Sequence, residues 1–391
     1  MASATTAKIS VHDVVDLLCA MLRFDTTNPP GNEKPLAEML AAFMSEKGFA
    51  VELTDLGNNR ANVTARLNGN GERKTLLFNG HLDVVPPGQM AWEHASPFDP
   101  VVKDGKIYGR GSSDMKGGLA AMIVAATAVK ATGRALKGDL IITCSADEES
   151  GSLGARDFRQ KGGLENVGAI IVGESSSCGI NIAEKGALWI EIYTVGKTAH
   201  GAFPEQGINA ITAMNAVLTE LTNYTFSYQP NKLLGHPSLN ISTIQGGVKT
   251  NVVPDRCVLT LDIRTVPGME HNGIVKDIQA ICERVKTERP GLSIEVNPIN
   301  DRPAVETVAN DPFIVMAQEV IRDNFGREES VHGVSFYTDA AIFLPGTNIP
   351  AILYGPGEAA MAHQPNEYVP IAGLEEAARF YAAMIERYLI D

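Results

Sequence analysis

The sequence of 391 residues contains no apolar stretch long enough to cross a bilayer as a helix. Its longest apolar stretch, Leu119 to Val129, falls well short of the ~20 residues that a spanning helix needs. The first ten residues, MASATTAKIS, also lack the apolar core of a secretory signal. We therefore expect a cytoplasmic protein that has no membrane as a partner.

Basic residues are too few for a chain that binds nucleic acid or an anionic membrane surface. Lys and Arg number 33 against 46 Asp and Glu, which gives a formal net charge of −13. Both kinds of partner need a basic face. The excess of acidic residues therefore argues against nucleic acid and an anionic membrane as the main partner, and it is typical of a solvated surface.

The sequence also lacks the cysteine spacing of a disulfide framework or a thiolate zinc site. Its five cysteines are odd in number, are widely spaced and include no Cys-x-x-Cys pair. This pattern is typical of reduced thiols that pack in the interior. A metal site in this protein would therefore use ligands other than sulfur.

No repeat or low-complexity segment is present, and the length exceeds what one hydrophobic core usually organises. In the first half, short apolar runs alternate with helical patterns, which predicts an α/β domain with a largely parallel sheet flanked by helices. In chain order these segments are KTLLFNG, a helical pattern over 115–129, DLIITCSA, a helical pattern over 153–161, and AIIVGE.

From about Gly186 the pattern changes to alternating strands and helices in the order β-α-β-β-α-β. This order predicts a compact, ferredoxin-like domain with a half-exposed sheet. After Asp301 the first pattern returns, with a helix over 312–324 and the strand IPAILYGPG. We therefore expect an α/β domain formed by residues 1–186 and 300–391, interrupted by an inserted domain at 187–299.

Polar side chains follow the predicted strands of the α/β domain, at the edge where ligands collect in such sheets. His81 and Asp83 follow the first strand, Glu148 and Glu149 the second, and Glu174 the third. His81 and Asp83 leave the same face of the chain, so the carboxylate can orient a metal-binding imidazole. Taken singly, each residue has an ordinary structural explanation such as a solvated loop, but together they favour a metal site.

Two further residues extend this set. Asp114 lies in the turn YGRGSSDMKGG, where it could cap the following helix, although the flanking glycines favour close approach to a ligand. His363 follows another apolar strand, in GPGEAAMAHQPNEYV. Carboxylates and imidazoles without thiolate suit Zn²⁺, and also Co²⁺ or Mn²⁺. We expect two divalent ions, about 3.5–4 Å apart and bridged by one carboxylate.

These motifs resemble the family of dinuclear zinc exopeptidases and deacylases that includes acetylornithine deacetylase, succinyl-diaminopimelate desuccinylase, aminoacylase and glutamate carboxypeptidase. The resemblance runs from about Leu76 to Val369, with the motifs in the order of the family. It implies a catalytic α/β domain interrupted by a lid. It also implies these roles: His81 and Glu174 bind one ion, Glu149 and His363 bind the other, Asp114 bridges, Glu148 is the general base, and Asp83 orients.

In the inserted domain the resemblance implies substrate contacts and a dimer interface. His200, in VGKTAHGAFPE, would polarise the substrate carbonyl, often from the partner subunit. Asn251, in GGVKTNVVPD, and Arg264, in LDIRTVPG, would hold the carboxylate of the substrate. A guanidinium binds a carboxylate through two hydrogen bonds, and an imidazole can stabilise an oxyanion. The family lid commonly forms the dimer contact, so we expect a homodimer through residues 187–299.

The expected activity is hydrolysis of the amide bond of an N-acyl amino acid or small peptide with a free carboxylate. A water shared by the two ions would attack, with Glu148 as the general base. Met115 follows Asp114 where many peptidase members have a second Asp, which favours deacetylation or desuccinylation over dipeptide cleavage. Dipeptidase or carboxypeptidase activity, hydrolysis of an ester or carbamoyl bond, and an inactive binding protein remain alternatives.

Asp339, in GVSFYTDAAIF, lies where relatives shape their specificity. Its carboxylate could meet a cationic group of the substrate. Capping of the following helix is an equally good interpretation. The acyl group and the amino acid side chain of the substrate do not follow from the sequence, because loops shape the pocket.

Overall fold

A computed structural model describes residues 7–391 and divides the chain into two compact units. The first unit contains the residues up to Ala183, together with Glu306–Gly333 and Thr338–Asp391. The second unit contains Glu184–Val305 and Val334–Tyr337. Within the described range, no helix is both long enough and apolar enough to cross a membrane.

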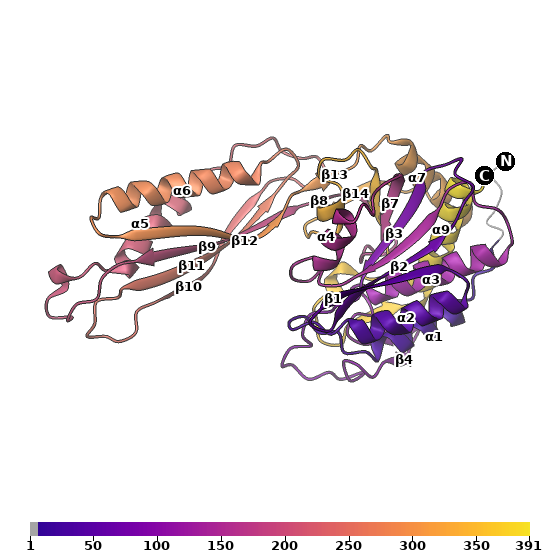
Figure 1. Cartoon of the computed structure of the whole chain (residues 1–391), viewed down its shortest axis with the longest axis horizontal. Coiled ribbons are helices and arrows are strands. Elements are labelled where there is room, and N and C mark those ends of the chain that lie inside the picture. The colour runs from indigo at the N-terminus through magenta and orange to yellow at the C-terminus, as the bar shows by residue number, and fades with distance from the viewer. Residues whose placement is uncertain (1–6) are drawn as a thin grey trace. The chain divides into compact units, whose positions relative to one another are not determined.

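A mixed sheet of nine strands forms the centre of the first unit (Figure 1). The order is β1-β2-β6-β3-β7-β15-β8-β13, and β14 pairs with β8. The pairs β6–β3, β3–β7 and β7–β15 are parallel, whereas the pairs toward β1 and between β15 and β8 are antiparallel. The strands are β1 (Ala50–Gly57), β2 (Arg60–Leu67), β3 (Thr75–His81), β6 (Leu140–Ser145), β7 (Val167–Val172), β8 (Ile180–Glu184), β13 (Val305–Glu306), β14 (Val331–Val334) and β15 (Ala351–Leu353).

Every residue of β3 and β6 is buried, as expected for central parallel strands that are covered on both faces. Helix α3 packs against α1 and α9 in this cover. The prediction of an α/β fold with a largely parallel central sheet is thus confirmed. The helices are α1 (Val11–Leu22), α2 (Lys34–Glu46), α3 (Lys116–Ala131), α4 (Leu153–Gln160), α7 (Pro312–Phe325), α8 (Ala340–Phe343) and α9 (Ile371–Leu389), with a 3₁₀ turn η2 (Ala359–Met361).

A small three-stranded sheet joins two distant segments of the first unit. Its order is β16-β5-β4, from β4 (Val101–Lys103), β5 (Lys106–Tyr108) and β16 (Tyr368–Pro370). Val369 of β16 lies opposite Ile107 of β5 in an antiparallel pair. This pairing brings the residues that follow His363 beside the turn that carries Asp114.

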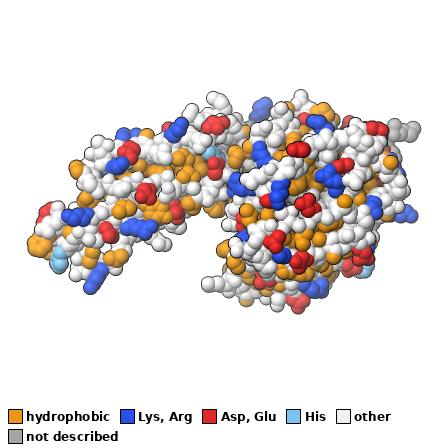
Figure 2. Space-filling model, in the orientation of Figure 1, with side chains coloured by type: hydrophobic (Ala, Val, Ile, Leu, Met, Phe, Trp, Pro, Cys, Tyr) orange, Lys and Arg blue, Asp and Glu red, His pale blue; other side chains and the backbone are white. Residues whose placement is uncertain are grey.

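The second unit contains β9 (Gly186–Val195), η1 (Pro204–Gln206), α5 (Ala210–Thr222), β10 (Ser238–Gly246), β11 (Arg256–Thr265), α6 (His271–Thr287) and β12 (Ser293–Arg302). Its antiparallel sheet has the order β10-β11-β9-β12. Alternate residues such as Leu188, Ile190, Leu259 and Leu261 are buried in one core with residues of both helices. The intervening residues remain partly exposed, and Figure 2 shows hydrophobic side chains among charged ones over this unit.

Candidate metal centre

His81, at the carboxyl end of β3, is surrounded by carboxylates. Its Nε2 atom lies 3.1 Å from Oδ1 of Asp114 and 3.4 Å from Oε1 of Glu174. Burial lowers the pKa of the imidazole, but the hydrogen bonds to Asp114 and Glu174 outweigh it, so the pKa lies well above its ordinary value. The carboxylates around His81 therefore favour its imidazolium form in the metal-free protein.

His363 lies on the other side of Asp114. Its Nε2 atom is 3.3 Å from Oδ2 of Asp114 and 3.2 Å from Oε2 of Glu149. Hydrogen bonds to these two carboxylates raise the pKa of His363 to about 10. Burial raises the pKa of Asp114, but the hydrogen bonds to His363 and His81 outweigh it, and its pKa lies far below the usual range. Asp114 thus presents one oxygen to each histidine, as a bridging carboxylate does.

Glu148 lies beside His81 and Glu174 and is buried, with 5 % of its surface exposed. Within residues 7–391, no hydrogen-bond donor reaches its Oε1 atom. Burial raises the pKa of Glu148 well above its ordinary value; the charge of His81 opposes this shift, and Glu174 adds to it. A buried carboxylate oxygen without a donor is costly, so this atom indicates a partner that is not part of the chain, such as a cation or a water.

The ligand atoms form two groups that could each hold a metal ion. One group contains His81, Glu148 and Glu174, and the other contains His81, Asp114 and Glu149, with the ligand atoms of each within 4.8 Å of one another. Both groups offer oxygen and imidazole nitrogen only, a donor set that suits Zn²⁺, Co²⁺ or Mn²⁺. These groups include Glu148, which the sequence predicted as the base, and omit His363, which contacts Asp114 and Glu149 instead. The donor atoms present fit divalent ions, while the assignment of each ligand stays a prediction.

Asp83 connects the histidine strand with the two glutamates. The backbone N–H groups of Glu148 and Glu149 donate to Oδ1 and Oδ2 of Asp83, each at 3.1 Å. Nδ1 of His81 lies 2.9 Å from the backbone oxygen of Asp83 and 3.6 Å from its Oδ1. The carboxylate thus holds the backbone of Glu148 and Glu149, while the carbonyl is the closer partner of the imidazole.

Glu367 holds the backbone of the turn that carries Asp114, a role that no motif in the sequence predicts. Its carboxylate lies 2.6 Å from Nη1 of Arg110, and both side chains are buried. The same carboxylate accepts three backbone N–H groups, those of Gly111, Ser113 and Asp114, at 2.8–3.0 Å. The only signal in the sequence is the position of Glu367 four residues after His363.

Asp339 lies in the interior of the first unit. Its Oδ2 atom accepts hydrogen bonds from Oγ of Ser145 at 2.5 Å and from Nδ2 of Asn79 at 3.2 Å. The Asp339 side chain does not cap α8; instead the N–H of Ala340 donates to Oγ1 of Thr338 at 3.1 Å. At 1 % exposure, Asp339 has little surface with which to meet a substrate in this structure.

The predicted substrate residues His200, Asn251 and Arg264 belong to the second unit. His200 and Asn251 are both exposed, and the N–H of Gly201 donates to the backbone oxygen of Asn251 at 2.8 Å. Nε of Arg264, on β11, lies 2.9 Å from Oδ1 of Asp262. The fold thus places His200 and Asn251 on neighbouring segments, while the guanidinium of Arg264 pairs with a carboxylate of its own strand.

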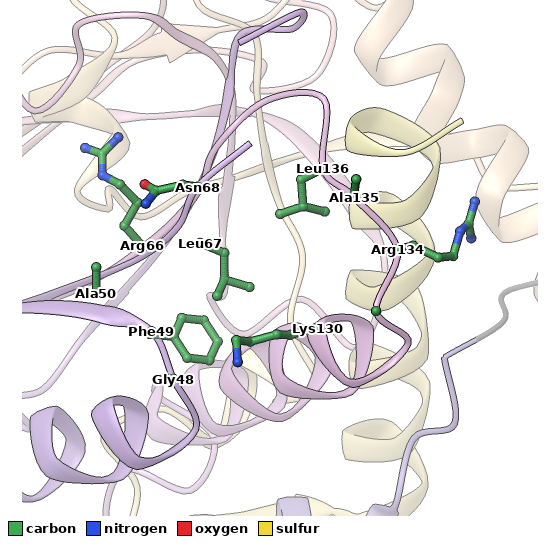
Figure 3. Close-up of a pocket in the computed structure, with 11 residues that line it drawn as sticks. Gly48, Phe49, Ala50, Arg66, Leu67, Asn68, Lys130, Arg134, Ala135 and Leu136 are labelled. Atoms are coloured by element: carbon green, nitrogen blue, oxygen red, sulfur yellow. The ribbon is translucent and has the colours of Figure 1, made fainter. Parts of the chain in front are cut away.

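A surface hollow of about 680 Å³ lies elsewhere on the first unit, between the start of β1 and the C-terminal end of α3 (Figure 3). Its basic lining residues are Arg66, Lys130 and Arg134. Arg66 pairs with Asp139, and Arg134 pairs with Asp391. None of the predicted site residues lines this hollow, so we assign no catalytic role to it.

Comparison with known proteins gives an independent view of the chain. The sequence profile of Peptidase family M20/M25/M40 matches residues 77–387. A protein named probable succinyl-diaminopimelate desuccinylase from Staphylococcus aureus is 29% identical over 389 residues, a match that covers 92% of this chain and 93% of that protein. An acetylornithine deacetylase from Vibrio cholerae is 30% identical over 364 residues, and the match covers 92% of each protein.

A solved structure shows the same fold. An M20 family metallo-carboxypeptidase from Sulfolobus solfataricus superposes with a TM-score of 0.81 at 19% identity. The superposition covers 96% of this chain and 99% of that one. The similarities therefore extend over nearly the whole chain, and the family match over residues 77–387 spans the positions of the candidate metal centre.

Proposed function

Because this chain belongs to peptidase family M20/M25/M40 and is a metallohydrolase that acts on amides, we propose that its substrate is an N-acyl amino acid with a free carboxylate. The reaction would be a deacetylation or a desuccinylation. One observation carries the catalytic part of this proposal: Asp114 offers one oxygen to His81 and the other to His363, and Glu148 lies beside His81 and Glu174. This arrangement provides a bridging ligand and a separate base.

Two divalent ions are the proposed cofactors, most simply Zn²⁺, with Co²⁺ or Mn²⁺ as alternatives. His81 and Glu174 would hold one ion, Glu149 and His363 the other, and Asp114 both. When bound, such ions polarise a substrate carbonyl and lower the pKa of a shared water.

Glu148 is the proposed proton carrier. Its buried Oε1 has no donor within residues 7–391, so it can accept a proton from the attacking water. The same carboxyl group then donates that proton to the nitrogen of the leaving amine. The backbone of Glu148 is held by Asp83, which keeps the side chain aimed at the site during both transfers. No covalent intermediate with the protein is required.

The choice of an acylated amino acid over a peptide rests on two observations. The curated relatives described above are named as a desuccinylase and a deacetylase. Met115 also follows Asp114, as in the deacylase branch of the family that the sequence resembles. The structural neighbour is named as a carboxypeptidase, which keeps peptide hydrolysis as the second candidate.

A substrate panel with the metal-loaded enzyme tests this proposal. The panel contains N-acetylornithine, N-succinyl-diaminopimelate, hydrophobic N-acetyl amino acids, dipeptides and matched esters. We expect the highest kcat/KM with one of the acylated amino acids. Faster cleavage of the dipeptides would show that the protein is a peptidase. Faster cleavage of the matched esters would show that the bond it hydrolyses is an ester and not an amide.

The second unit is proposed to provide substrate contacts and a dimer interface. His200 would stabilise the oxyanion, and Asn251 and Arg264 would bind the carboxylate of the substrate. Strand β10 is an edge strand of its sheet, and it exposes Ile241 at 37% and Ile244 at 50%. An exposed apolar edge strand favours pairing with another chain. Light scattering coupled to gel filtration should give the mass of a dimer, and a monomer with full activity would overturn this part. A cytoplasmic location also stays a prediction.

A further inference from the structure

Asn28 contacts the carboxylates of Asp83 and Asp147, the two residues that hold the Glu148–Glu149 segment. Its Nδ2 atom donates to Oδ2 of Asp83 at 2.8 Å and to Oδ1 of Asp147 at 2.9 Å. Asp83 accepts the N–H groups of the two glutamates, and Asp147 directly precedes them in the chain. With only 3 % of its surface exposed, Asn28 is an internal link between β3 and the loop after β6.

Asp147 closes that loop upon itself. Its Oδ2 atom accepts the N–H groups of Gly151 at 3.1 Å and Leu153 at 3.3 Å. Its backbone has a φ of 71°, in the left-handed region that is unfavourable for a residue with a side chain. The hydrogen bonds of the Asp147 carboxylate therefore offset a strained backbone at the position where the chain turns toward Glu148.

Arg60, on β2, determines which way the Asn28 amide faces. Its Nη2 atom donates to Oδ1 of Asn28 at 2.8 Å, and its Nη1 atom lies 2.6 Å from Oδ1 of Asp147 and 2.9 Å from Oε1 of Glu33. An amide oxygen can only accept, and an amide NH₂ can only donate. Since Arg60 takes the oxygen of Asn28, the NH₂ group must face the carboxylates. The opposite orientation would set oxygen against oxygen.

Arg60 also supplies the positive charge that pairs with Glu33 and Asp147 in this cluster. Both carboxylates are buried, and removal of the guanidinium would leave them without this ion-pair partner. Arg60 makes its contacts with separate donor atoms of one planar group, which a lysine cannot reproduce. The guanidinium of Arg60 can therefore fix the positions of its partners as well as neutralise their charge.

We propose that Arg60 and Asn28 are positioning residues for the metal centre. Arg60 orients the Asn28 amide, and Asn28 holds the carboxylates of Asp83 and Asp147 at a fixed distance from each other. The loop that carries Glu148 and Glu149 then keeps both side chains directed toward the ligands from the other strands. This inference rests on the proposed function of that centre. Neither residue touches substrate or metal in this role.

The test uses Arg60→Lys and Asn28→Leu in the full-length protein, with Arg66→Lys as the matched control. Arg66 lies on the same strand and pairs with Asp139, away from the Glu148 loop. Hydrogen exchange of the metal-free proteins reports on residues 147–153 directly. We expect exchange there to be roughly 10-fold faster in both variants, together with a loss of roughly 10-fold or more in Zn²⁺ affinity. The control should change neither quantity.

Kinetics then separate positioning from a general loss of stability. We expect kcat to fall at saturating metal while KM stays within about twofold, because substrate contacts are unchanged. Unchanged exchange over 147–153 in Arg60→Lys, or equal changes in Arg66→Lys, would overturn the inference. If Asn28→Leu does not fold, Asn28→Asp replaces it, since it keeps the shape and removes the donor. Failure of the wild-type enzyme on every amide would count against the proposed function alone, because the exchange result does not depend on turnover.

Discussion

His363 and Glu149 are 214 residues apart in the sequence, yet Nε2 of His363 lies 3.2 Å from Oε2 of Glu149. The pairing of β16 with β5 brings the segment that follows His363 beside the turn of Asp114. Asp114 in turn accepts from both histidines. The candidate metal centre is therefore closed by a contact between the first and the last segment of the first unit.

Replacement of Glu148 by Gln should separate catalysis from metal binding. The variant keeps the shape of the side chain and loses the proton acceptor, so we expect kcat to fall by about 10²–10⁴-fold with little change in KM. Metal content, measured on the same samples, should remain that of the wild type.

Glu149→Gln is the matched control for this experiment. Glu149 lies beside His363 and is a proposed ligand, so its loss should lower metal affinity as well as turnover. Near wild-type turnover in a metal-loaded Glu148→Gln enzyme would show that Glu148 is not the base.

Metal binding at neutral pH should release protons. The pKa of His81 lies well above its ordinary value, and that of His363 is raised to about 10, so the surrounding carboxylates favour the imidazolium form of both rings before metal binds. A ligating imidazole must give up that proton. Calorimetric titration with Zn²⁺ in two buffers of different ionisation enthalpy should yield about two protons or more per chain.

The same linkage gives a direction with pH. Apparent metal affinity should rise as pH rises from 6 to 8, because fewer protons then compete for the rings. A binding enthalpy that does not depend on the buffer, or an affinity that falls with rising pH, would contradict the protonation states described for His81 and His363.

Glu33 should make the stability of the metal-free protein depend on pH. Burial, and then the charge of Asp83, raise the pKa of Glu33 to about 7, against the opposing charge of Arg60. The raised pKa means that the folded state favours the protonated carboxyl group. Glu33 therefore contributes to the free energy of unfolding below pH ~4.5, and this contribution is lost as pH rises through ~7.

Urea unfolding of the metal-free wild type and of Glu33→Gln measures this contribution. Between pH 5 and 8, the wild type should lose on the order of 3 kcal/mol of unfolding free energy relative to the variant. Glu38→Gln, at an exposed position on α2, is the control and should follow the wild type. A parallel pH dependence in all three proteins would rule out this role for Glu33.

Glu367→Gln should weaken the support of the Asp114 turn. The change breaks a buried ion pair with Arg110, which typically costs about 3–5 kcal/mol when one partner is removed. The carboxylate also accepts the N–H of Asp114, so we expect lower Zn²⁺ affinity in addition to lower stability. Urea unfolding and competition with a metal chelator measure the two effects.

Glu375→Gln, an exposed position on α9, controls for the loss of one negative charge. It should leave both quantities unchanged. A Glu367→Gln protein with wild-type metal affinity would show that the Asp114 turn keeps its geometry without this carboxylate.

The sequence alone determined the α/β class, while the boundaries of the inserted domain stay a prediction. It also identified the polar residues that follow β3, β6 and β7. These features are local, because strand and helix patterns and the residue type at a strand end are readable within a few residues. Parallel strands place their carboxyl ends at one edge of a sheet, so His81, Glu148 and Glu174 could be expected together before their distances were known.

Only the tertiary structure decided how that site is held. Asn28 and Arg60 carry no local signal, and Glu367 carries only its spacing from His363, because each acts through hydrogen bonds to residues far away in the sequence. The direction of the Asp83 carboxylate, toward the backbone of Glu148, likewise depends on how two strands lie side by side. A buried polar group must find its partner wherever the fold places one, and that partner cannot be read from neighbouring residues in the chain.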